Sequence, residues 1–84
     1  MNRQYILYNL GDAKSQIVET ISKMETDDEY EYGDFVIDMS HLYHHVNIAW
    51  NARDATDEAV DACSQANFDR WRKMPSNAEL LLED

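Results

Sequence analysis

The feature that most constrains this chain is the helical periodicity of residues 34–53, DFVIDMSHLYHHVNIAWNAR. Apolar residues recur there at alternating spacings of four and three, so on a helix with about 100° per residue they share one side. A broad apolar stripe of this kind is typical of a helix that packs on a core. Its members are Phe35, Met39, Leu42, Val46 and Ala49, and Arg53 continues the same spacing at the end of the helix. Val36, Tyr43 and Trp50 widen the stripe on one flank.

The opposite side of the same predicted helix is also unusual. A surface helix would carry Lys and Glu there, but this one carries Ile37, His41, His44 and Ile48, followed by Ala52. This second face predicts a helix that is contacted on two sides, either as the middle helix of a bundle or at an interface with a second copy or another protein. Its first four residues are therefore candidate interaction residues.

Two further helical patterns flank the central one. Residues 3–25 predict a first helix, with apolar positions at Ile6, Leu10, Ala13, Ile17, Ile21 and Met24. Gly11 costs about 1 kcal/mol relative to Ala inside a helix, so the alternative is a separate segment up to Asn9 and a helix that starts near Asp12. Residues 56–74 predict a third helix after a short break at Arg53, and the alternative is a continuous helix through residue 54.

The sequence thus predicts an all-α fold, a small antiparallel three-helix bundle forming a single domain over residues 1–84. Pro75 ends the third helix, and residues 76–79 resemble a capping box. Leu80, Leu81 and Leu82 then form either a short C-terminal helical turn or a frayed tail. The predicted core comprises Leu10, Ile17, Ile21, Phe35, Met39, Leu42, Val46, Trp50, Val60, Cys63, Trp71 and Met74.

Charge narrows the classes of partner. The chain has 17 acidic and 7 basic residues, a net charge of -10, which repels nucleic-acid phosphates and anionic lipid and attracts basic proteins. No run of 18 apolar residues and no signal peptide is present, and the lone Cys63 suits a reducing compartment. We therefore expect a cytoplasmic protein without membrane or nucleic-acid contacts, with the general character of small bacterial or phage proteins.

Acidic residues concentrate in residues 25–34, ETDDEYEYGD. The stretch predicts a loop in which Asp34 is the N-cap of the central helix. Its acids do not have the spacing of a calcium-binding EF-hand loop. Tyr30 and Tyr32, which alternate with glutamates, are candidate anchors for a basic protein partner.

One cluster could hold a metal ion. Asp38, His41 and His45 are spaced i, i+3 and i+7, and carboxylate and imidazole are zinc ligands. A fourth ligand would have to come from another helix or another chain. The alternative is that the histidines are packed or solvated and bind no metal. We favour this alternative, and we therefore expect no cofactor.

No catalytic motif accompanies these residues: the chain has no phosphate-binding Gly loop and no nucleophile elbow. The sequence therefore favours a non-enzymatic protein-interaction module whose partner is another protein or a second copy. The alternatives are a metal-binding helical protein that uses the histidine cluster, and an acidic nucleic-acid mimic that occupies a basic partner. Protonation of His41 and His44 near about pH 6 would weaken an apolar contact or strengthen an acidic one.

Overall fold

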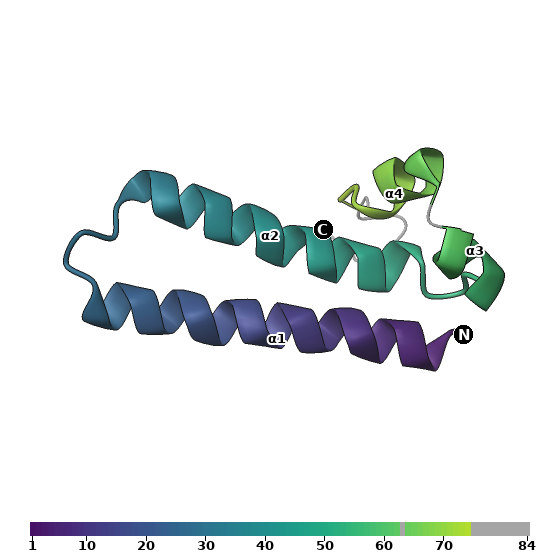
Figure 1. Cartoon of the computed structure of the whole chain (residues 1–84), viewed down its shortest axis with the longest axis horizontal. Helices are drawn as coiled ribbons and strands as arrows, with labels where there is room; N and C mark the ends of the chain where they lie inside the picture. The colour runs from purple at the N-terminus through teal and green to yellow at the C-terminus, as the bar shows by residue number, and fades with distance from the viewer. Residues whose placement is uncertain (63, 75–84) are drawn as a thin grey trace, which may run out of the picture.

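The structure, a computed structural model, describes residues 1–62 and 64–74. Within these ranges the elements are helices α1 (Arg3–Thr26), α2 (Tyr32–Asn51), α3 (Asp57–Ala62) and α4 (Gln65–Trp71), without a strand. Helices α1 and α2 lie side by side as a long antiparallel hairpin, and the two short helices lie at the end of the hairpin that holds the N-terminus (Figure 1). The all-α fold is confirmed.

Helix α1 is continuous through Gly11, so the alternative of two N-terminal segments is wrong. Asn2 caps it by accepting a 3.1 Å hydrogen bond from the Tyr5 N–H, which satisfies one of the free amides of the first turn. The last turn carries Lys23, a cation that suits the negative end of a helix.

Helix α2 begins earlier than predicted. Glu31, not Asp34, is the N-cap residue, and the Asp34 carboxylate accepts a 3.0 Å hydrogen bond from the Glu31 N–H. Asp34 thus occupies the third helical position, where an acid also stabilises a helix start. The helix ends at Asn51, so the predicted break near Arg53 is confirmed and a continuous helix through residue 54 is wrong.

The predicted third helix, residues 56–74, is divided into α3 and α4. Ser64 caps α4 by accepting a 3.2 Å hydrogen bond from the Asn67 N–H, and this local bond competes with continuation of α3. The amides of Asn47 and Asn51 on α2 then donate to the carbonyls of Arg72 and Trp71, at 2.9 and 2.7 Å. Helix α4 is thereby held against α2.

The core differs most from the prediction. Among the described residues, the buried hydrophobic side chains are those of Ala13, Ala49, Ala52 and Trp71. Of the predicted core residues, Trp71 alone of those described is buried. Four more are half-buried: Met39, Leu42, Trp50 and Val60. The other six described are exposed: Leu10, Ile17, Ile21, Phe35, Val46 and Met74.

The two long helices instead contact each other through small and polar residues. The buried residues of α1 are Asn9, Ala13 and Thr20, and we call them the contact line of α1. The buried residues of α2 are Asp38, Asn47 and Ala49, of which Asn47 binds the backbone at the end of α4. The contact line of α2 therefore comprises Asp38 and Ala49, and the buried Ala52 follows directly after the helix. Small side chains let two helix backbones approach closely, and this is why the hairpin forms through a side of each helix that the apolar periodicity did not indicate.

Four predicted features lie outside the described residues: Cys63 in the core, the helix end at Pro75, the capping box of residues 76–79 and the turn at Leu80–Leu82. None of the helices in the described part of the chain has the length and apolar character needed to cross a membrane.

Candidate functional site

The most unusual surface of the hairpin is an exposed apolar stripe on each long helix. We call the residues of the two stripes together the apolar face. Their exposed fractions run from 36% for Phe35 to 56% for Met24. The apolar face comprises Leu10, Ile17, Ile21 and Met24 on α1, and Phe35 and Val46 on α2.

The two stripes lie on the same side of the hairpin. At about 100° per residue, each stripe lies roughly 80° further round its helix than the contact line, in the direction in which the residue number increases. For a viewer who looks along the hairpin, increasing residue number runs clockwise round one of the two antiparallel helices and anticlockwise round the other. The two contact lines point at each other, so a rotation of roughly 80° from each contact line leads to the same side of the hairpin. The two stripes therefore lie next to each other on one surface.

Charge is almost absent from the apolar face. By the same 100° rule, the charged residues in line with it or at its margins are Arg3, Lys14 and Glu25 on α1 and Arg53 at the end of α2. Arg3 and Arg53 lie at the N-terminal end of the hairpin, away from the centre of the face. The Arg53 guanidinium lies 3.9 Å from the centre of the Trp50 ring, a cation–π arrangement that keeps the cation at the edge. The acids that give the chain its negative charge therefore lie elsewhere on the surface.

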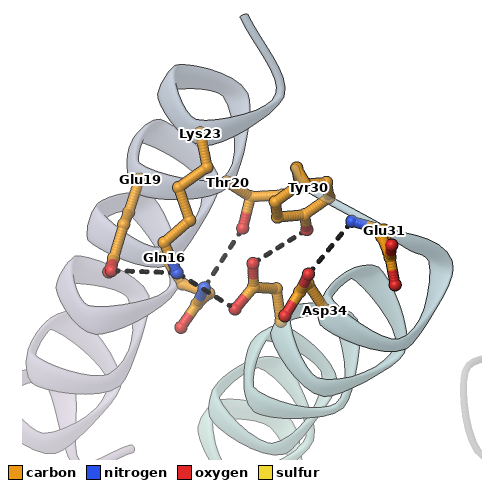
Figure 2. Close-up of polar contacts among 8 residues, drawn as sticks. Gln16, Glu19, Thr20, Lys23, Tyr30, Glu31 and Asp34 are labelled. Atoms are coloured by element: carbon orange, nitrogen blue, oxygen red, sulfur yellow. Dashed lines mark hydrogen bonds and ion pairs between the residues drawn. The ribbon is translucent and has the colours of Figure 1, made fainter. Parts of the chain in front are cut away.

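A polar cluster closes the opposite end of the hairpin from the N-terminus. The Tyr30 hydroxyl donates to Asp38 Oδ2 at 2.8 Å, and Lys23 Nζ lies 3.5 Å from Asp38 Oδ1 and 3.3 Å from Glu19 (Figure 2). Burial, followed by the hydrogen bond and charge of Asp38, raises the pKa of Tyr30 to about 12. The hydrogen bond with Glu19, followed by the charge of Asp38, outweighs desolvation and raises the pKa of Lys23.

The cluster changes the interpretation of three candidate residues. Asp38, a predicted metal ligand, is buried and is bonded to Tyr30. Tyr30, a predicted anchor for a basic partner, is thereby held inside the chain, whereas Tyr32 is 82% exposed and free to contact a partner. The acidic turn thus offers one tyrosine to a partner where the sequence suggested two.

The three histidines have different surroundings. His41 is exposed, and His45 is half-buried with its Nδ1 4.0 Å from Asp12 Oδ2 on α1. Burial, followed by the positive charge of Arg72 and the two other histidines, lowers the pKa of His44. Across the described ranges, no three His, Cys, Asp or Glu side chains gather closely enough to hold a metal ion, so Asp38, His41 and His45 do not form such a group within one chain.

The predicted second face of α2 is divided. Ile37 and His41, in its first half, are exposed. His44 and Ile48, in its second half, are half-buried, and the neighbouring Asn47 and Asn51 bind the backbone at the end of α4. The chain's own C-terminal region thus occupies part of the surface that the sequence assigned to a partner.

The apolar face was missed because five of its six residues, all except Met24, were assigned to the core. One signal was present: Asn9, Ala13, Gln16 and Thr20 form a small and polar line beside the apolar line of α1. Such a line can pack closely on a neighbouring helix and leave the large residues free.

Comparison of the chain with protein-family models, with curated proteins and with solved structures found no match.

Proposed function

We propose that this chain is a non-enzymatic protein-interaction module that binds through its apolar face. The observation that carries the proposal is the exposure of large apolar side chains, side by side, from two long helices. A patch of this kind on a folded protein marks an interaction site when it is contiguous and has a polar rim. In the surface that runs from Leu10 and Met24 on α1 to Phe35 and Val46 on α2, helical geometry brings such side chains together, and Lys14 and Glu25 lie at its margin.

The energetics of burial support the same proposal. Burying a Leu, Ile or Phe side chain completely contributes about 1.5 to 3 kcal/mol, and each residue of the apolar face has between a third and about half of its surface left to bury. A partner that covers the face gains a part of that free energy at several positions. An uncharged centre also avoids the desolvation of buried charges.

The other candidate surfaces support a partner less well. Helix α4 covers part of the second face of α2, and Tyr30 is bonded to Asp38. The exposed pair Ile37 and His41 remains available, but its area is small compared with that of the apolar face. We therefore place the binding surface on the apolar face, not on Ile37, His41, His44 and Ile48.

A matched pair of variants tests the proposal. Ile17→Ser with Val46→Ser makes the apolar face polar without changing charge, and Ile37→Ser changes a still more exposed isoleucine on another side of α2. Tagged wild-type and variant chains are expressed in the source cell and cross-linked, and the recovered proteins, including untagged copies of the chain, are compared. We expect Ile37→Ser to retain the wild-type complexes and the double variant to lose them. Recovery of the same complexes by all three chains would contradict the proposal.

A further inference from the structure

We infer that the occupant of the apolar face is a second copy of this chain, so that two hairpins pack face to face as a four-helix bundle. This inference rests on the proposed function, because it requires the apolar face to be a binding surface.

The first argument is the amount of apolar surface that the described helices leave exposed. The six side chains of the apolar face keep between 36% and 56% of their surface exposed. An exposed apolar patch of this kind is uncommon on a soluble monomer, and burial against a second copy removes it from water.

The second argument is the weakness of the core. In the described ranges, three of the four buried hydrophobic side chains are alanines, and Trp71 is the only large one. A short chain with so little buried apolar surface needs additional burial to fold stably. Many obligate homodimers solve this problem by folding and associating together. A second copy is also the one partner that is present whenever the chain itself is present.

The third argument is that the apolar face is complementary to a second copy of itself. In a two-fold dimer the same surface meets itself, so any charge at its centre would meet a like charge. The centre of the apolar face is uncharged, although the chain carries a net charge of -10. Lys14 and Arg53 at the margins can approach acids of the other copy.

The position of α4 leaves the face open for this purpose. Trp71 packs edge-on against Tyr5, with ring centres 6.1 Å apart, and α4 is bonded to Asn47 and Asn51 of α2. By the 100° rule Tyr5, Asn47 and Asn51 lie on sides of α1 and α2 other than the apolar face. The bundle would then have close seams of small residues within each hairpin and wide seams of large residues between hairpins.

The test is sedimentation equilibrium of the full chain from micromolar to millimolar concentration, with the same variants. We expect twice the chain mass for wild type and for Ile37→Ser, and a dissociation constant raised at least tenfold for Ile17→Ser with Val46→Ser. Because the two copies are acidic, the wild-type dimer should tighten as salt is raised. A melting temperature that rises with wild-type protein concentration supports the dimer even if the double variant does not fold.

The outcomes separate the two proposals. A wild-type chain that is helical and monomeric up to millimolar concentration overturns the second copy as occupant, and the co-purification experiment then decides the proposed function by itself. A dimer that survives in the double variant unchanged shows that the apolar face is not the interface between copies. In a mixture of labelled and unlabelled wild-type chains, intermolecular nuclear Overhauser effects at the Ile17 and Ile21 methyl groups support the inference, and a dimer that lacks them contradicts it.

Discussion

The Tyr30 hydroxyl donates a 2.8 Å hydrogen bond to the carboxylate of Asp38, and this bond joins the turn after α1 to the second turn of α2. Asp38 is only 6% exposed, and a buried carboxylate destabilises a fold unless hydrogen bonds and charges satisfy it. Tyr30 and Lys23 do so from the loop and from α1. The pair therefore fixes the closed end of the hairpin from within the chain.

Removal of this carboxylate should destabilise the hairpin. We expect Asp38→Ala to lower the free energy of unfolding by about 2 kcal/mol, because a hydrogen bond to a charged group typically contributes 1.5 to 3 kcal/mol. Urea unfolding followed by circular dichroism measures the change at a fixed protein concentration. Asp28→Ala is the matched control, since Asp28 is an exposed aspartate of the same turn. Equal losses in the two variants would show that the Tyr30–Asp38 bond contributes nothing.

The same bond predicts that the Tyr30 hydroxyl loses its proton at an unusually high pH. The pKa of Tyr30 is raised from 10.0 to about 12, so the folded state favours the protonated hydroxyl. The stabilisation is present below about pH 10 and is lost as the pH rises toward 12. The phenolate absorbance of wild type minus that of Tyr30→Phe should therefore appear near pH 12. In Asp38→Asn it should appear at lower pH, and an unchanged position would contradict this role of Asp38.

The sequence predicted the elements of the fold well. The periodicity of α1 and α2 extends over about five to six turns, and helical patterns of that length are specific. The break after Arg53 also followed from local signals, because Asp54, Thr56 and Asp57 favour a turn and a new helix start. The division of the third helix at Ser64 was missed, since a single serine cap is a weak signal within an otherwise helical pattern.

The side on which the helices meet could not be predicted from the same signals. Periodicity shows which side of a helix is apolar, but it does not show whether that side is covered from within the chain or by another chain. Here the ion pair between Lys23 of α1 and Asp38 of α2 and the burial of Ala13 and Ala49 place the contact on an adjacent side. The candidate site was lost for the same reason, because Ile17 and Val46 were counted as core.

Gly11 offers a stabilising substitution. It lies within α1, is exposed, and an added Cβ would meet nothing within 4 Å. We expect Gly11→Ala to raise the free energy of unfolding by about 0.5 to 1 kcal/mol, because alanine restricts the unfolded chain and favours helix. Thermal unfolding measures it. Gly33→Ala, equally free of contacts but in the first turn of α2, should give a smaller gain, and destabilisation by Gly11→Ala would contradict the continuous helix.

His44 predicts that acid weakens the contact between α2 and α4. Burial, Arg72 and the other two histidines lower its pKa, so the unfolded state takes up the proton more readily than the folded state. The stabilisation is complete above pH 6.5 and is lost as the pH falls below that value. We expect the urea midpoint to fall less between pH 7.5 and 5.5 in His44→Gln than in wild type. A wild-type slope in His44→Gln would contradict the prediction.

Asn2 has two separable roles at the N-terminal end of the hairpin. Its Oδ1 accepts from the Tyr5 N–H and caps α1, while its Nδ2 donates to the Ala55 carbonyl at 3.0 Å and to Asp57 Oδ1 at 3.1 Å. The first bond stabilises a helix start by about 1 kcal/mol. The other two tie α1 to the segment that begins α3, although the two regions are more than 50 residues apart in sequence.

Two substitutions separate these roles. Asn2→Asp keeps the cap acceptor but replaces the donor with a charge that repels Asp57, so α3 should loosen while the start of α1 stays intact. Asn2→Ala loses both, so both regions should loosen. Amide hydrogen exchange distinguishes them: the Tyr5 N–H reports the cap, and the Val60 N–H, which donates to the Thr56 carbonyl, reports α3. Exchange at Val60 that is as slow in Asn2→Asp as in wild type would mean that α3 is held by other contacts, such as the bond from the Asn2 backbone N–H to the Arg53 carbonyl.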